Sequence, residues 1–115
     1  MKKVLVIAAN DAVRKTLVLI LENSCKVIEA CNGLKGITTL QEDPSIKFVI
    51  IDNQMPEMDG LMVIKCIRQA KLDTKTMLIS GRKEFEEIAL KAGADYFMEK
   101  PFVDVRDIVS LVTKN

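Results

Sequence analysis

Residues 48–60 read FVIIDNQMPEMDG, and this stretch decides the fold class of the chain. It begins with an apolar run that is typical of a buried strand, and the run ends on the carboxylate of Asp52. A polar loop follows, and Asp59 and Gly60 at its end are expected to cap and start a helix over 61–70. A buried strand, a loop and an amphipathic helix in this order predict one βα unit of a parallel sheet.

The same pattern recurs four more times along the chain. Short runs rich in Val, Leu and Ile alternate with segments whose apolar residues recur at helical spacing. We predict strands at 3–8, 26–30, 47–52, 75–80 and 95–98, and helices at 12–23, 34–41, 61–70, 84–91 and 103–113. Strands that are apolar throughout are covered on both faces. Residues 1–115 are therefore expected to form a single α/β domain around a parallel sheet of five strands.

Composition excludes several classes of protein. The chain has 115 residues, of which 49% are hydrophobic, and its formal net charge is +1. A disordered chain has fewer apolar residues and a larger net charge, and a nucleic-acid-binding domain is usually strongly basic. No apolar run approaches the roughly 18–20 residues of a membrane helix. We therefore expect a folded domain that binds neither nucleic acid directly nor a membrane.

The residue types present also limit the chemistry and the compartment. There is no histidine, which excludes catalytic triads of the Ser-His-Asp and Cys-His kinds. The three cysteines, Cys25, Cys31 and Cys66, form no C-x-x-C pair and are odd in number. Free thiols of this kind are typical of a reducing cytoplasm, where we expect the protein to lie.

Polar residues that could carry chemistry stand where the predicted strands end. Asp52 ends the third strand, Ser80 the fourth, and Lys100 follows the fifth, whereas Ala8 and Ala9 end the first. In doubly wound sheets ligands bind beyond the carboxyl ends of the strands, so we expect these side chains to converge there. A carboxylate with a hydroxyl and an ammonium group beside it suits the acceptance of a phosphoryl group.

Three stretches of the chain together resemble response-regulator receiver domains. They are the segment 48–60 quoted above, GADYFMEKPF at 93–102 and MLISG at 77–81. The resemblance covers essentially the whole chain. It implies a flavodoxin-like (βα)5 fold, in which a doubly wound parallel sheet of five strands has the order 2-1-3-4-5.

The resemblance also implies a role for individual residues. Asp52 matches the aspartate that takes a phosphoryl group from a histidine kinase or a phosphotransfer protein, and Lys100 matches the lysine that pairs with the phosphoryl oxygens. Ser80 matches the hydroxyl residue that turns toward the phosphate, and Phe97 falls at the aromatic switch position. The backbone carbonyl of Gln54, with Asp52, would ligate Mg²⁺.

One position departs from the receiver pattern. Receiver domains normally end the first strand with two acidic residues that hold Mg²⁺, but this chain has Ala8 and Ala9 there. Mg²⁺ prefers octahedral oxygen ligation that includes one or two carboxylates. Asp11 lies too far into the turn, and Asn10 and Asp11 are the two candidates to cap the following helix. The metal site formed by Asp52 and Gln54 is thus expected to be weak or absent.

The resemblance implies an output through protein–protein contacts. The expected face is formed by the fourth helix, the fifth strand and the fifth helix. The segment from Ser80 to Gly93 is about two residues shorter than the resemblance implies, which alters this face. Because the last predicted helix runs to the end of the sequence, we expect either a separate partner protein for output or an excised domain of a longer chain.

Two functions remain open after this comparison, and neither is that of an enzyme. In the first, the chain is a two-component receiver domain that is phosphorylated on Asp52, as the retained Ser80 and Lys100 favour. In the second, it is a pseudo-receiver that binds a partner independently of phosphorylation, as Ala8 and Ala9 favour. A nucleotide or flavin binder is disfavoured, because no glycine-rich loop follows the first strand.

Overall fold

The computed structural model describes residues 1–102 and 104–115, in which strands and helices alternate along the chain. The strands are β1 (Lys3–Ile7), β2 (Lys26–Ala30), β3 (Phe48–Asp52), β4 (Lys75–Ser80) and β5 (Tyr96–Glu99). The helices are α1 (Asp11–Leu21), α2 (Gly33–Glu42), α3 (Gly60–Gln69), α4 (Phe85–Ala92) and α5 (Val105–Lys114). The strands form one parallel sheet in the order β2-β1-β3-β4-β5, which confirms the flavodoxin-like fold class.

The predicted boundaries differ from the observed ones by at most two residues. The first strand ends at Ile7 instead of Ala8, although the Ala8 N–H still donates to the carbonyl of Ala30 at 3.1 Å. The last helix begins at Val105, because the Asp104 side chain accepts a hydrogen bond from the Arg106 N–H and caps the helix there. The predicted start of this helix, at position 103, lies outside the described residues.

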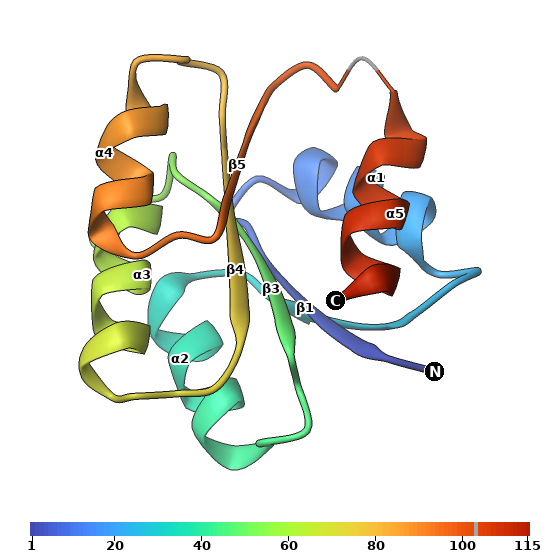
Figure 1. Ribbon diagram of the computed structural model, residues 1–115, viewed down its shortest axis with the longest axis horizontal. Helices are drawn as coiled ribbons and strands as arrows, with labels where there is room; N and C mark the ends of the chain where they lie inside the picture. Colours follow the sequence, from blue (N-terminus) through green and yellow to red (C-terminus); the bar gives the residue numbers. More distant parts are fainter. Residues whose placement is uncertain (103) are drawn as a thin grey trace.

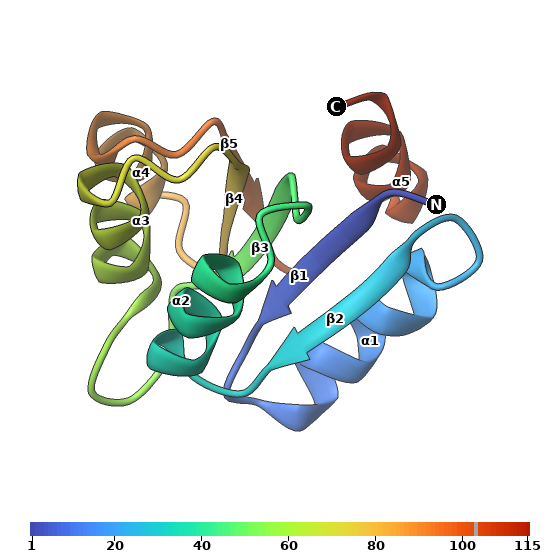
Figure 2. The ribbon, with the colours of Figure 1, turned by 90° about the horizontal axis from the view of Figure 1, so that it is seen from below.

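The helices cover both faces of the sheet. In Figure 1, α1 and α5 lie on one side of the strands, and α2, α3 and α4 lie on the other; Figure 2 shows the same division from below. Successive residues of β1 point to opposite faces, so Leu5 and Ile7 join the core under α2, α3 and α4, whereas Val4 and Val6 join the core under α1 and α5. Burial on both faces explains why the strands are apolar throughout.

The helix α4 is short and has no side-chain cap at its start. Side chains cap α1, α2, α3 and α5, but Glu84 at the start of α4 makes no such hydrogen bond. With eight residues α4 is the shortest helix, and Ala89 is its one fully buried residue. It ends as expected at Gly93, whose left-handed φ of 112° suits glycine. None of the helices described is both long and apolar enough to cross a membrane.

A close backbone approach fixes the loop that follows β3. Asp59 caps α3 by accepting from the Met62 N–H at 2.9 Å, as the sequence predicts. A Cβ atom on Gly60 would lie 2.9 Å from the Asp52 carbonyl oxygen and from the Asn53 Cα. Only glycine fits this position. Because it has no side chain, the start of α3 can lie directly against the end of β3.

Candidate functional site

The predicted polar residues meet at the carboxyl edge of the sheet. Asp52 ends β3, where it pairs in register with Ile79 of β4. Ser80 ends β4, and its carbonyl accepts a hydrogen bond of 2.8 Å from the N–H of Lys100, just after β5. The parallel register of β3, β4 and β5 therefore brings Asp52, Ser80 and Lys100 to one edge, as the sequence predicts.

Asp52 and Lys100 form an ion pair at this edge. The Lys100 Nζ lies 3.1 Å from the Asp52 Oδ1, and the same oxygen accepts from the Gln54 N–H at 3.3 Å. The Asp52 side chain is 2% exposed and that of Lys100 is 20% exposed. Such burial reduces solvent screening, so the pair attracts more strongly than a surface pair. The peptide bond between Lys100 and Pro101 is cis, as the resemblance implies.

Ser80 and Phe97, the other two predicted site residues, make different contacts. The Ser80 Oγ is buried and accepts a hydrogen bond from the Arg82 N–H at 3.0 Å, which ties the hydroxyl to its own loop. The Phe97 ring is half-buried and packs against the core under α2, α3 and α4, which includes Ala89 and Leu78.

At the end of β1, Ala8 and Ala9 occupy the positions at which receiver domains carry acidic residues, and the guanidinium group of Arg14 lies beside them. Ala8 is buried, and its carbonyl oxygen accepts from Arg14 Nη1 at 2.8 Å. Arg14 also pairs with Asp11 at 2.6 Å and with Glu29 at 3.1 Å. Hydrogen bonding to Asp11 raises the pKa of Arg14 above its usual value. Of the two candidate caps, Asn10 takes the role at α1 by accepting from the Val13 N–H.

These donors do not fit a magnesium ion. Mg²⁺ requires near-octahedral oxygen ligation, usually with carboxylates and waters. Of the predicted ligands, Asp52 has one carboxylate oxygen that already accepts from Lys100 and from the backbone N–H of Gln54. Within residues 1–102 and 104–115, no three Asp, Glu, Cys or His side chains gather closely enough to hold a metal ion. Asp11 is engaged by Arg14 and its side chain is 76% exposed.

Two arginines with several hydrogen bonds were not predicted as important from the sequence. Arg14 donates to the carbonyl oxygen of Ala8 at the end of β1. Arg68, near the end of α3, pairs with Asp95 at 2.7 Å at the opposite edge of the sheet. A signal for the second pair was present in the sequence. Asp95 follows the helix-ending Gly93 and directly precedes the last strand, where a carboxylate can accept from backbone N–H groups.

Comparison with known proteins identifies the family. The response regulator receiver domain family matches residues 4–113. The chain belongs to this family. Among curated relatives, this receiver domain is 32% identical over 105 residues to the alkaline phosphatase synthesis transcriptional regulatory protein PhoP of Bacillus subtilis, covering 88% of the chain and 43% of PhoP. It is 29% identical over 102 residues to the transcriptional regulatory protein SrrA of Staphylococcus aureus, covering 87% of the chain and 42% of SrrA.

Solved structures show the same fold. The chemotaxis protein CheY4 of Vibrio cholerae superposes with a TM-score of 0.88 at 21% identity, over 99% of this chain and 98% of that one. The signal receiver domain of the putative response regulator NarL of Mycobacterium tuberculosis gives 0.86 at 27% identity, over 97% and 93% of the two chains. The receiver domain spans less than half the length of PhoP and SrrA. As a family, receiver domains are signalling modules that act with histidine kinases and effector domains.

Proposed function

We propose that residues 1–115 form a receiver domain that signals through protein–protein contacts without magnesium-dependent phosphorylation of Asp52. The observation that carries this proposal is the end of β1, where Ala8 and Ala9 offer no carboxylate and Arg14 engages the Ala8 carbonyl. Phosphoryl transfer depends on electrostatic stabilisation of the transferred oxygens, which a metal ion normally supplies. The residues at this edge lack the donors that would hold one.

The Asp52–Lys100 pair takes a structural role in this proposal. One carboxylate faces one ammonium group at 3.1 Å, so the buried edge is charge-balanced without any bound ion. The balanced pair keeps the ends of β3 and β5 together. The shape of this edge of the domain would then not depend on phosphorylation.

The proposed partner surface is the face formed by α4, β5 and α5. Two large apolar residues of α4, Ile88 and Leu90, are 51% and 47% exposed. Val105 at the start of α5 is 46% exposed. Large exposed apolar side chains on these elements are available for contacts with a partner protein. A downstream effector domain or a kinase is the class of partner that the family implies.

A second candidate function is supported by the retained residues Asp52, Ser80 and Lys100. Here Asp52 accepts a phosphoryl group from a histidine kinase or a phosphotransfer protein, while Ser80 and Lys100 steady its oxygens. The closeness of Lys100 to Asp52 favours this function, because an ammonium group beside the carboxylate would pair with the added oxygens. This candidate has to operate without the usual acidic residues of β1.

Incubation of the full chain with acetyl phosphate and MgCl₂, followed by intact mass measurement, tests the choice between the two. We expect no phosphoryl adduct on the wild-type chain. A stoichiometric adduct that disappears in Asp52→Asn would establish the phosphoacceptor function and overturn the first proposal.

A companion variant tests the physical reason. In Ala8→Asp with Ala9→Asp, the added carboxylates restore oxygen donors beside Asp52, and we expect calorimetric titration to detect Mg²⁺ binding. The matched control is Ala12→Asp with Thr16→Asp, which adds the same charge on exposed positions of α1. If the first variant binds Mg²⁺ no more tightly than the control, then the end of β1 is not what excludes the metal.

A further inference from the structure

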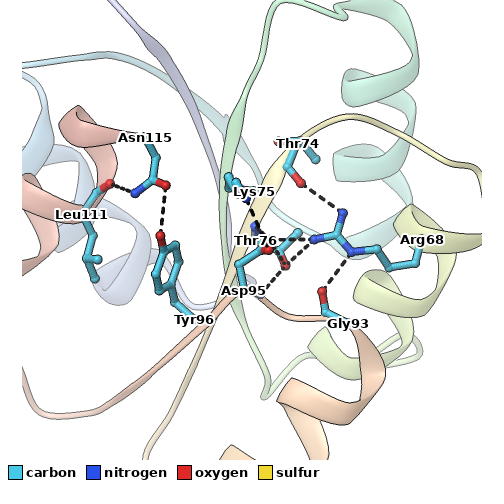
Figure 3. A network of polar contacts seen from close by, with 9 residues as sticks. All are labelled: Arg68, Thr74, Lys75, Thr76, Gly93, Asp95, Tyr96, Leu111 and Asn115. Carbon is cyan, nitrogen blue, oxygen red and sulfur yellow. Dashed lines mark hydrogen bonds and ion pairs between the residues drawn. The ribbon is translucent and has the colours of Figure 1, made fainter.

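A polar network lies at the amino edge of the sheet, where β4 and β5 begin, whereas Asp52 ends β3 at the carboxyl edge. Figure 3 shows this network, which is centred on Arg68. Its guanidinium group lies between Thr74 and Gly93 and points toward Asp95 and Thr76. It donates to the carbonyl oxygens of Gly93 at 2.9 Å and of Thr74 at 3.1 Å. It also donates to the Thr76 Oγ1 at 3.2 Å and to the Asp95 Oδ2 at 2.7 Å. One side chain of α3 therefore connects the α3–β4 loop, β4, the end of α4 and the start of β5.

The Asp95 carboxylate forms the second half of this network. Its Oδ2 accepts from the Thr76 N–H at 2.8 Å as well as from Arg68. Its Oδ1 lies 3.9 Å from the Nζ of Lys75, whose side chain is 55% exposed. The Asp95 N–H donates to the Thr76 carbonyl oxygen at 3.0 Å. Arg68 and Asp95 thus fix the turn between α4 and β5 from two sides.

The same turn is the point at which α4 could move. Gly93 has the left-handed φ of 112°, and a Cβ atom there would lie 2.7 Å from the Arg68 Cγ. The aliphatic part of the Arg68 side chain therefore packs against Gly93, while its guanidinium group donates a hydrogen bond to the Gly93 carbonyl oxygen. At its other end α4 has no side-chain cap, and Ala89 is its one fully buried residue. Both features favour release of the helix.

We propose that Arg68 is a latch that holds α4 closed, so that segment 85–95 opens as a separate unit when the latch is broken. The opening uncovers the part of the core that Ala89 joins, a cluster that also includes Leu78 and Phe97. It leaves α1, α2 and the Asp52–Lys100 pair in place, because Arg68 contacts none of them. The proposal does not depend on whether Asp52 is phosphorylated.

Amide hydrogen exchange measured at increasing urea concentrations separates a latch from a residue that only adds global stability. Local opening exposes little surface, so its free energy depends weakly on urea, whereas global unfolding depends on it strongly. In the wild-type chain we expect amides 86–92 to exchange with a weak urea dependence, and amides of β1 and β3 with a strong one. In Arg68→Met, exchange of 86–92 should accelerate by about tenfold or more and keep its weak urea dependence.

Two further variants make the test sharp. Lys75→Ala removes the exposed cation next to Asp95 and should change exchange of 86–92 by less than about twofold, as expected for a surface charge. Arg68→Lys keeps the charge but loses the planar fork, so it should accelerate exchange nearly as much as Arg68→Met.

Three results would overturn the latch. The first is exchange of 86–92 in the wild-type chain with the strong urea dependence of β3. The second is an Arg68→Met effect no larger than that of Lys75→Ala. The third is an Arg68→Lys variant that behaves as wild type, because charge alone would then account for the effect.

Discussion

Two ion pairs lie at opposite edges of the same sheet, and they are built differently. At the carboxyl edge, the Asp52 carboxylate meets Lys100 at 3.1 Å and accepts one further hydrogen bond, from the backbone N–H of Gln54. At the amino edge, the Asp95 carboxylate meets Arg68 at 2.7 Å within a network that also includes backbone groups and a hydroxyl. The Asp52 side chain is 2% exposed, whereas that of Asp95 is 27% exposed.

The difference shows how burial and the number of partners determine what one residue contributes. A nearly fully buried carboxylate with one cation depends on that cation, since removing it leaves an uncompensated charge. A partly exposed carboxylate with several partners keeps most of its hydrogen bonds when one partner is removed, and water replaces the lost one. Loss of a partner should therefore affect global stability more at Asp52 than at Asp95.

The largest effect is expected for Lys100→Met. The variant leaves the Asp52 carboxylate buried without its cation, and we expect the free energy of unfolding to fall by about 3 kcal/mol. Urea unfolding followed by circular dichroism measures this change. The double variant Lys100→Met with Asp52→Asn removes the unpaired charge and should recover more than half of the loss.

A matched control for this prediction is Lys47→Met. Lys47 lies 3.4 Å from Asp73, and both side chains are more than half exposed. This surface pair should contribute less than about 0.5 kcal/mol. A loss in Lys100→Met as small as in the control would mean that burial of Asp52 has no energetic consequence.

A smaller effect is expected for Asp95→Asn at the other edge. The amide oxygen can still accept from the Thr76 N–H, so only the charge-assisted part of the bond to Arg68 is lost. We expect a loss of about 1 kcal/mol in the free energy of unfolding. If urea unfolding gives a larger loss here than in Lys100→Met, the number of partners does not protect this carboxylate.

The sequence predicts the carboxyl edge better than the amino edge, for a physical reason. Asp52, Ser80 and Lys100 each stand at the end of an apolar strand, and parallel strands bring such ends together whatever the helices do. The contacts of Arg68 depend on the angle at which α3 crosses the sheet and on the turn at Gly93. The position of Asp95 before the last strand is visible in the sequence, but its pairing with Arg68 depends on this tertiary packing.

The same distinction explains the errors at element ends. The predicted last helix included position 104, but Asp104 caps α5 and the first helical residue is Val105. At α1 two candidate caps stand side by side, and Asn10 takes the role while Asp11 pairs with Arg14. Which of two neighbouring polar residues becomes the cap depends on the other partners that the fold offers.

Within the network at the amino edge, one group lacks a partner, which gives a third prediction. Among the described residues, the Thr74 Oγ1 is buried and makes no hydrogen bond. Thr74→Val replaces this hydroxyl by a methyl group of similar size, so unfolding stability should stay unchanged or rise by up to about 1 kcal/mol. Thr76→Val is the matched control, because it removes a hydroxyl that Arg68 and Asp95 contact, and it should lose about 1 kcal/mol. Equal losses in both variants would contradict the assignment.

The smallest effect is expected at a third carboxylate, Asp43, which lies on the surface. Hydrogen bonds from Ser45 and from Lys3, whose Nζ lies 2.9 Å away, lower the pKa of Asp43 from 3.8 to about 2. Because the folded-state pKa is below the unfolded one, the stabilisation is present above about pH 4 and disappears as the pH falls toward 2.

The variant Asp43→Asn lacks this titration, so it isolates the contribution of the carboxylate. Comparing its urea midpoint with that of the wild-type chain between pH 5 and pH 2 should show a gap that is largest at pH 5 and closes below about pH 3. The gap should also shrink in 1 M NaCl, since salt screens exposed pairs. A gap that is constant with pH would show that the ionisation of Asp43 does not stabilise the fold. The Asp52–Lys100 pair, which is shielded from solvent, should differ from Asp43 in keeping its contribution in the same salt.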